Sequence, residues 1–367
     1  MEDIQQEIEN KREKYEKALR EGGVARWWQV FEEEKNEWKT QKVNVAIAGR
    51  SGTGKTSFIN AVVKKWTGTR PAKVRVTETT MECVGYAHPN NPNIILWLLP
   101  GVGTENFPQA NYLAKVKADL FDAFVIMTAD RFMELDTWLG KEMQARNKPV
   151  IFVRTKFGMD VENSKHDDPE KDEKTVFKEM KRNMMAKSDK TFGVFVIDSH
   201  KSDMYEFSDL EKCITEKLPV KKGQALVFSI SCISRDHLML KVKALKNHIW
   251  CAGLVSLALG LIPTLSGFTE ETIVKSHASF YVKQLGLDVR SLELTAVNPT
   301  KVDSVKCKVA EVMADIPVMT ERPTVARFFQ VLPLVGGAIS AEVVSNSLKE
   351  ILNRLEAIAL EAIDAVN

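Results

Sequence analysis

The stretch "GRSGTGKT", from Gly49 to Thr56, is the part of the sequence whose residue types and spacing point most directly to chemistry. It fits the pattern G-x-x-x-x-G-K-[ST], follows the apolar stretch "VNVAIA" and opens a stretch of helical character. In that context the backbone N–H groups of a glycine-rich loop surround phosphate oxygens, and the helix N-terminus adds partial positive charge. Lys55 is expected to reach the β- and γ-phosphates, and Thr56 to offer its hydroxyl to Mg²⁺. The pattern therefore predicts nucleotide binding at this phosphate loop.

The elements that must position the loop are short apolar strands that alternate with amphipathic helices. We expect strands at 43–49, 93–99, 123–129, 150–155 and 193–198. We expect helices near 55–66, 109–119, 132–146 and 173–186. Such alternation predicts an α/β fold, a parallel sheet with helices on both faces. The charged run "SKHDDPEKDEK" at 164–174 is expected to be a solvated loop that enters a helix.

The two ends of the chain have a different pattern. Residues 3–38 are polar and helical in character, and from 221 onward no strand pattern remains. Helices are expected there, broken at Pro263, Pro299, Pro317, Pro323 and Pro333. We therefore expect three segments: N-terminal helices over 1–38, a domain carrying the phosphate loop over 39–220, and helices over 221–367. The N-terminal helices are expected to complete the C-terminal helical domain.

Composition restricts the function classes. The 367 residues are 44% hydrophobic and 27% charged, as in an ordinary globular protein long enough for two domains. The 51 basic and 49 acidic residues give a net charge of +2, which does not favour a nucleic-acid partner. The five cysteines lack a C-x-x-C pair, and the six histidines lack metal-ligand spacing. Since the N-terminal stretch has no secretory pattern, we expect a cytoplasmic protein.

Several stretches together resemble the immunity-related GTPases, interferon-inducible relatives of the dynamin-type GTPases. These are "GRSGTGKTSFINAV", "TTME", "HPNNPNIILWLLPGVGTENFP" and "FVRTK". The resemblance covers most of the chain and is weaker at the extreme C-terminus. It implies a Ras-like domain inserted between N- and C-terminal helices, with GTP or GDP and Mg²⁺ as ligands. It also implies GTP hydrolysis, self-assembly through the nucleotide face, and peripheral association with internal membranes in innate, cell-autonomous immunity.

The resemblance assigns residues to three kinds of role. Phosphate binding falls to Gly49, Arg50, Ser51, Gly52, Thr53, Gly54, Lys55, Thr56 and Ser57. Thr80 is implied as the switch threonine that caps Mg²⁺ together with Thr56, although Thr79 is an equal choice and a plain strand role is open. The catalytic set is then Lys55, Thr56, Thr80 and Gly101. Candidates at the base are Thr155, Lys156, Asp160, Asp198 and Ser199.

Three positions depart from the family pattern. Leu98 replaces an aspartate that normally holds Mg²⁺, which weakens metal binding, most of all with the γ-phosphate present. Gly158 stands where an aspartate normally accepts two hydrogen bonds from guanine. Val102 follows the turn glycine and cannot hydrogen-bond an attacking water, so we expect slow turnover by the monomer and faster turnover on self-association.

Alternatives stay open at these departures. Asp160 either swings in toward the base or caps the next turn, and Asp198 offers a carboxylate from another side. The chain is then either a GTP hydrolase, a hydrolysis-deficient scaffold that regulates active relatives, or an NTPase with relaxed base specificity. The apolar runs at 249–268 and 328–344 are either buried helices or surfaces that reach a membrane. For the first run, a buried helical hairpin is the favoured interpretation.

Overall fold

The computed structural model describes residues 2–68, 72–74, 83–187, 192–260, 270–294, 299–320 and 333–364. The chain forms two compact units. One is continuous, Trp38–Ile230, and the other combines Met1–Glu37 with Ser231–Asn367. Each unit is described below by itself.

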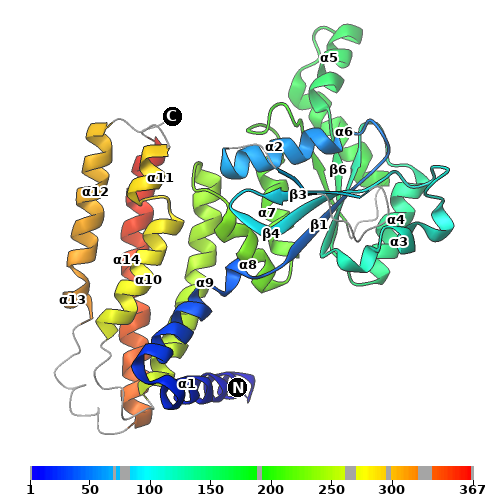
Figure 1. Ribbon diagram of the computed structural model, residues 1–367. Helices are drawn as coiled ribbons and strands as arrows, with labels where there is room; N and C mark the ends of the chain where they lie inside the picture. The colour runs from blue at the N-terminus through cyan, green and yellow to red at the C-terminus, as the bar shows by residue number, and fades with distance from the viewer. Residues whose placement is uncertain are drawn as a thin grey trace. The chain divides into compact units, whose positions relative to one another are not determined.

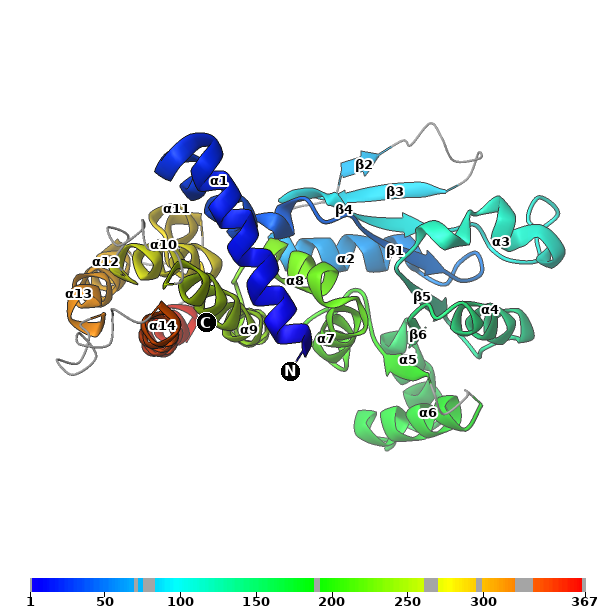
Figure 2. The same cartoon turned by 90° about the horizontal axis from the view of Figure 1, so that it is seen from below.

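The continuous unit is built on a seven-stranded sheet (Figure 1). Its strands are β1 (Val43–Ala48), β2 (Ala72–Val74), β3 (Val84–His88), β4 (Asn91–Leu98), β5 (Ala123–Thr128), β6 (Val150–Arg154) and β7 (Gly193–Val196). Their order is β2-β3-β4-β1-β5-β6-β7, which Figure 2 shows from the β2 edge downward. The five expected strands are present and parallel to one another, which confirms the α/β prediction. The antiparallel strands β2 and β3 at one edge were not expected.

Helices cover both faces of this sheet. They are α2 (Lys55–Thr67), α3 (Tyr112–Lys115), α4 (Glu134–Ala145), α5 (Phe157–Asp167), α6 (Glu173–Lys187), α7 (Phe207–Lys217) and α8 (Val220–Ser229). Every residue of β5 and β6 is buried, as strands covered on both faces require. One apolar layer joins the sheet to α2, α7 and α8, and a second joins it to α3, α4 and α6. The expected helices on both faces are thus confirmed.

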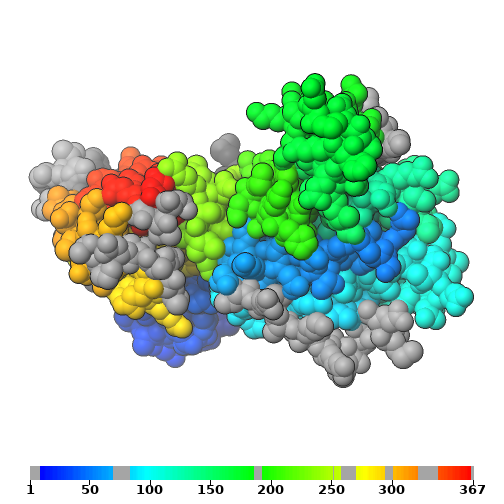
Figure 3. Space-filling model, turned by 90° about the horizontal axis from the view of Figure 1, so that it is seen from above, coloured from blue at the N-terminus to red at the C-terminus, as the bar shows by residue number. Residues whose placement is uncertain are grey.

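Two local predictions in this unit were wrong. The stretch 109–119 is not one helix, because it divides into a 3-10 turn η2 (Gln109–Asn111), the short α3, and a 3-10 turn η3 (Ala118–Leu120). The charged run at 164–174 is only partly a loop, because α5 continues to Asp167 and α6 begins at Glu173. The segment of α5 and α6 protrudes from the unit (Figure 3). Most of the charged residues of this run are exposed, so their charges stay in water whether the backbone is a helix or a loop.

The second unit is helical throughout its described residues. It contains α1 (Glu2–Lys35), α9 (Arg235–Gly260), α10 (Glu270–Gln284), α11 (Val289–Leu294), α12 (Pro299–Ala314), α13 (Ile316–Met319) and α14 (Pro333–Asp364). A 3-10 turn η1 (Glu37–Lys39) follows α1 in the chain. Helix α14 packs along α9 and α10, and α1 packs along α9. Pro299 and Pro333 each begin a helix, where a missing N–H costs nothing. Pro263 and Pro323 lie outside the described residues.

The described part of the apolar run 249–268 belongs to α9. Ile249, Ala252 and Val255 are buried among the helices, whereas Trp250 is 48% exposed. A methyl group at Gly253 would lie 2.7 Å from Ser345 Oγ, so this glycine permits the close approach of α9 and α14. Residues 261–269 and 321–332, which complete the two apolar runs, are outside the description. Among the described helices, none has both the length and the apolar character needed to cross a bilayer.

Candidate nucleotide-binding site

The phosphate loop connects the end of β1 to the start of α2. Gly54 caps α2 with φ 81° and ψ 19°, a left-handed conformation that a side chain makes costly. Gly49 has φ 137°, and a methyl group there would lie 2.3 Å from the carbonyl oxygen of Met127 on β5. The loop thus turns back over the sheet at a distance that only glycine allows. Such a glycine-rich loop before a helix N-terminus is suited to surround a phosphate group with backbone N–H donors.

The hydroxyls of two buried threonines donate hydrogen bonds to backbone carbonyl oxygens of the phosphate loop. Thr53 is 3% exposed, and its Oγ1 donates to the carbonyl oxygen of Arg50 at 2.9 Å. Thr155, directly after β6, places its Oγ1 2.8 Å from the carbonyl oxygen of Thr53 and 3.2 Å from that of Thr128. The sequence placed Thr155 at the base. In the structure its buried hydroxyl braces the phosphate loop from the neighbouring strands.

Lys55 turns its ammonium group into the loop. Its Nζ donates to the carbonyl oxygens of Gly49 at 2.7 Å and Arg50 at 2.8 Å. Burial lowers the pKa of Lys55, and the charge of Asp136 opposes that shift. The two carbonyl contacts are neutral acceptors, so a phosphate oxygen that carries charge is a stronger partner for the same ammonium group.

Asp136 is a charged neighbour that the sequence did not reveal. It lies in the first turn of α4, is 5% exposed, and accepts the backbone N–H of Met133 at 3.0 Å. Burial raises the pKa of Asp136, while the Met133 N–H and the charges of Arg50 and Lys55 lower it. Its only sequence signal was an acidic residue at a helix start, which is common for capping reasons alone. Asp136 balances the positive charge of the phosphate loop.

The mouth of the loop is open to solvent. Ser51, Gly52, Thr56 and Ser57 are exposed, while Thr53 below them is buried. Exposed donors on a rigid, buried base are what an incoming phosphate group needs. The predicted phosphate-binding residues thus form one continuous loop, in which Ser51, Thr56 and Ser57 are exposed with their hydroxyls.

The described residues offer few ligands for Mg²⁺ beside this loop. Thr56 contributes an exposed hydroxyl. Leu98 is the last residue of β4, pairs in register with Ile47, and packs against the apolar layer under α2. In the described ranges no three His, Cys, Asp or Glu side chains are grouped in a way that could hold a metal. Among the residues that the structure describes beside the loop, Thr56 is thus the one that offers an oxygen to Mg²⁺, and phosphate oxygens and water are suited to complete its coordination.

The turn after β4 adjoins the phosphate loop. A methyl group at Gly101 would lie 3.8 Å from Arg50 Cα and 3.9 Å from the carbonyl oxygen of Gly49. The Tyr112 hydroxyl donates to the carbonyl oxygen of Pro100 at 2.9 Å and fixes the turn from α3. Val102 packs its side chain against the apolar layer on that face. The side chain at position 102 therefore offers no polar atom to a water molecule at the site.

Lys156 stands at the base of α5 in an uncommon backbone conformation. Its φ is 60° and its ψ 32°, and α5 begins at the next residue. Phe157 is fully buried in a small apolar cluster with Val161, Val176 and Val196. The Phe157 N–H also donates to the carbonyl oxygen of Ile197 at 3.3 Å. This anchoring fixes the left-handed turn that presents Lys156, whose aliphatic stem is suited to cover a base.

The remaining base candidates lie in different environments. Arg154 Nη2 donates to Asp160 Oδ1 at 2.6 Å, and both side chains are largely buried. Burial raises the pKa of Asp160 and the charge of Arg154 lowers it. Asp160 lies in the first turn of α5, where its Oδ1 accepts the hydrogen bond from Arg154. Asp198 is 6% exposed and accepts the Gly158 N–H, whereas Ser199 is only half-buried. Thr79 and Thr80 lie outside the described residues.

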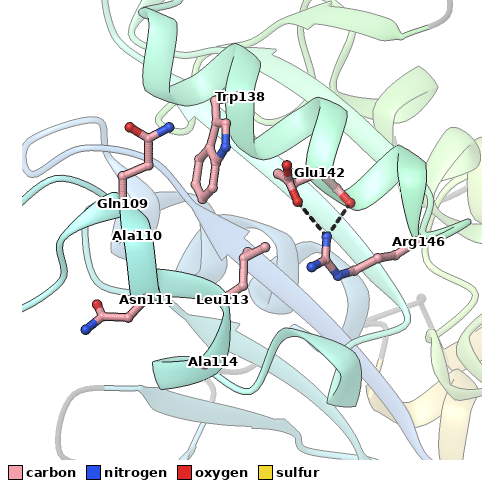
Figure 4. A pocket seen from close by; sticks show the side chains of 8 residues that line it. All are labelled: Gln109, Ala110, Asn111, Leu113, Ala114, Trp138, Glu142 and Arg146. Carbon is pink, nitrogen blue, oxygen red and sulfur yellow. Dashed lines mark hydrogen bonds and ion pairs between the residues drawn. The ribbon is translucent and has the colours of Figure 1, made fainter.

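A separate hollow of about 570 Å³ lies between η2, α3 and α4 (Figure 4). Trp138 and Leu113 face it, and Glu142 and Arg146 form an ion pair at 2.7 Å on its wall. None of its lining residues belongs to the phosphate loop or to the base loops. We assign it no role.

Comparison with known proteins agrees with this geometry. The model of the interferon-inducible GTPase (IIGP) family matches residues 8–359. The chain belongs to the interferon-inducible GTPase family. The match covers the phosphate loop, both base loops and most of the helical unit, as the sequence motifs predicted.

Individual relatives show how far the similarity extends. The chain is 30% identical over 365 residues to mouse interferon-inducible GTPase 1, covering 95% of this chain and 86% of that protein. It is 30% identical over 285 residues to mouse interferon-gamma-inducible GTPase 10, and that match covers 75% of this chain and 68% of that protein. Among solved structures, the G domain of the T. maritima FeoB iron transporter is 20% identical with a TM-score of 0.32. That similarity covers 48% of this chain and 99% of that structure.

Proposed function

We propose that this protein binds guanine nucleotide, with the phosphates on residues 49–57 and the base against Lys156. The geometry of the phosphate loop carries the proposal. Gly49 and Gly54 adopt the conformations that the loop needs, Thr155 braces it, and the Lys55 ammonium is already inside it. Membership in a family of GTPases supports GTP and GDP as the ligands.

Mg²⁺ is proposed to enter with the nucleotide. Thr56, and Thr80 by family resemblance, are the hydroxyl ligands of this chain, and phosphate oxygens complete the set. The ion would neutralise phosphate charge when bound. Because Leu98 supplies no oxygen, we propose that the complex with GDP depends less on Mg²⁺ than the complex with GTP. Lys55 and the loop N–H groups hold the phosphates in either state.

Hydrolysis of GTP is proposed to be slow in the monomer. Val102 is an apolar side chain packed against the core, so it cannot orient an attacking water as a glutamine at this position would. We propose that a second copy, which meets the first across the nucleotide face, completes the catalytic arrangement. We further propose that the assembled protein associates peripherally with internal membranes in cell-autonomous immunity and is otherwise cytoplasmic.

A second candidate is a nucleotide-dependent scaffold without hydrolysis. The specific observation in its favour is the packing of Leu98 into the layer under α2, next to the phosphate loop. A carboxylate cannot replace that side chain without losing apolar contact. The scaffold would bind GTP and regulate active relatives through its nucleotide state.

One experiment separates these candidates. Purified protein with Mg²⁺ is incubated with GTP, and separately with ATP, over a range of protein concentrations, and the products are quantified by chromatography. Specific activity that rises with concentration for GTP alone supports the assembly-dependent GTPase. Protein that binds GTP but releases no phosphate at any concentration supports the scaffold. Turnover of both nucleotides would instead indicate relaxed base specificity.

Flotation with liposomes, in the presence of GTP, GDP or no nucleotide, tests the membrane proposal. We expect more protein to float with GTP than without nucleotide. Equal absence from the floating fraction in all three states contradicts membrane association.

A further inference from the structure

The loops that follow β6 and β7 meet at Gly158 and Asp198. The Gly158 N–H donates to Asp198 Oδ2 at 2.9 Å. A methyl group built on Gly158 would lie 2.4 Å from that same oxygen. The Asp198 carboxylate therefore occupies the space into which any side chain at position 158 would project. Gly158, which lacks a side chain, and Asp198, which carries a carboxylate, are therefore in direct contact.

The pairing of β6 with β7 in the sheet brings Gly158 and Asp198 into contact. Strands β6 and β7 are parallel neighbours with Arg154 opposite Val196, so their carboxyl ends lie at the same edge. The Ile197 N–H donates to the carbonyl oxygen of Arg154 at 2.8 Å, which carries the pairing beyond the strands. Asp198 follows at once. In parallel α/β sheets, ligands bind outside the carboxyl ends of the strands, which is where this carboxylate lies.

The carboxylate keeps capacity for a ligand. Its Oδ2 accepts the Gly158 N–H, and its Oδ1 accepts the His200 N–H at 2.8 Å. An ionised carboxylate has about four acceptor positions, so each oxygen retains about one. In the described part of the chain, no lysine or arginine forms an ion pair with Asp198. Two adjacent N–H donors on a planar ligand would match the two free positions.

Guanine has this pair of donors, N1–H and the 2-amino group, side by side on one edge. Adenine has neither in that arrangement, and hypoxanthine lacks the 2-amino group. We propose that Asp198 reads the guanine base in place of the carboxylate missing at position 158. This inference rests on the proposed guanine-nucleotide binding. The alternative carboxylate, Asp160, already accepts a hydrogen bond from the Arg154 guanidinium at 2.6 Å.

A purely structural role for Asp198 makes a different prediction. Its bond to the Gly158 N–H satisfies one of the free donors at the start of α5. As a cap alone, Asp198 would affect stability and the affinity for all nucleotides equally. As the base-reading group, it sets the ratio of affinities between bases. The ratio for GDP against XDP, the xanthine nucleotide, therefore separates the two roles, because xanthine carries a carbonyl in place of the 2-amino group.

The test measures GDP and XDP binding to the full chain by calorimetry. The wild type is expected to prefer GDP. In Asp198→Asn, the amide oxygen still accepts N1–H and the amide nitrogen donates to the xanthine carbonyl. We therefore expect GDP affinity to fall about a hundredfold and the preference to turn toward XDP. Asp160→Asn is the matched control, with an unchanged ratio.

A second pair of variants tests the proposal even if the Asp198→Asn protein does not fold. Asp198→Ser alone should lose about a hundredfold in GDP affinity, since nothing then reads the base. The double variant Gly158→Asp with Asp198→Ser moves the carboxylate to the other loop and should restore GDP affinity to within about threefold. Gly158→Asp alone should bind GDP less well than the double variant, because its side chain meets the resident carboxylate.

The outcomes separate the two proposals. Wild-type protein that binds GDP, with Asp198 variants that keep both its affinity and its GDP-to-XDP ratio, overturns this inference and leaves the proposed function standing. A ratio that changes in Asp160→Asn instead also overturns it. Wild-type protein that binds no guanine nucleotide overturns both.

Discussion

The hydroxyl of Thr155 lies 2.8 Å from the carbonyl oxygen of Thr53, although the two residues are 102 positions apart in the sequence. This contact joins the loop after β6 to the phosphate loop after β1. The side chain is 1% exposed, so the bond is made in the interior of the unit. The phosphate loop is thus supported by the element that also leads to Lys156 and the base.

Replacing Thr155 tests that support. Thr155→Val keeps the shape of the side chain but removes its hydroxyl donor. The buried Thr53 carbonyl oxygen then loses this hydrogen bond, at a cost of about 1–3 kcal/mol in unfolding free energy. We expect nucleotide affinity to fall about tenfold, as measured by calorimetry, with a parallel loss of unfolding free energy. Thr320→Val is the control, because it removes a buried hydroxyl bond in the helical unit. It should lower stability and leave nucleotide affinity unchanged; an equal effect on affinity would contradict the coupling.

Lys55 is expected to contribute strongly to nucleotide affinity and little to the thermal stability of the protein. Lys55→Ala removes the ammonium group that phosphate oxygens need, and GDP affinity should fall at least about a hundredfold. Since burial disfavours this charge in the ligand-free loop, thermal stability without nucleotide should change little or rise. Lys64→Ala, exposed on the same helix, is the matched control for both measurements. Undiminished GDP binding by Lys55→Ala would exclude the phosphate loop as the site.

Gly49 should be far less tolerant of a side chain than Gly68, a second glycine with positive φ in the same unit. In Gly49→Ala the new methyl group would meet the Met127 carbonyl oxygen at 2.3 Å, so strands β1 and β5 would have to separate. We expect a loss of about 3 kcal/mol or more in urea unfolding. Gly68 has φ 73° but no atom within 4 Å of such a methyl group. Gly68→Ala should therefore cost only about 1 kcal/mol. Similar losses of unfolding free energy in both variants would contradict the contact with the Met127 carbonyl oxygen as the cause of the loss in Gly49→Ala.

Acid should destabilise the helical unit through its buried histidines. His248 and His277 have ring centroids 5.1 Å apart. Burial lowers the pKa of His248 to about 4 and that of His277 well below its usual range, with Lys35 adding repulsion at both. Both groups take up protons more readily when unfolded, near pH 6.5. Stability is therefore complete above about pH 6.5 and is lost as the pH falls toward 4.

Urea unfolding of the full chain at several pH values measures this loss. His277→Phe should reduce the slope of unfolding free energy against pH between about 6.5 and 4, because one proton-binding difference disappears. His166→Asn, at an exposed histidine of the other unit, should leave the slope unchanged. A slope that His277→Phe does not alter would place the acid sensitivity elsewhere.

The parallel core of the sheet could be predicted because its strands are continuous apolar runs. Val150 to Arg154 is buried at every residue, and such a run between helices has few other interpretations. Strand β3, "VGYAH", is short, contains glycine and lies near an edge, so its pattern is weak. Helix α5 begins at Phe157, and most of its later residues are polar or charged. The burial of Phe157 and Val161 against Val176 and Val196 is a tertiary effect that outweighs this local charge.

The phosphate loop was predictable for a related reason. Its residues are consecutive, so their spacing alone carries the geometry. The contact of Gly158 with Asp198 joins two loops, and the sequence shows each residue without the other. Asp136 likewise approaches the loop from a different helix. Sequence reasoning finds sites made by one segment and misses the side chains that other segments bring to them.

The close approach of Gly158 and Asp198 also bears on how this chain diverged from its relatives. A side chain at 158 and the carboxylate at 198 would occupy the same volume, so a chain that carried both would be strained. The two positions should therefore covary across the family: where 158 carries an aspartate, 198 should be small. A change at either position alone would leave the site crowded or without a carboxylate.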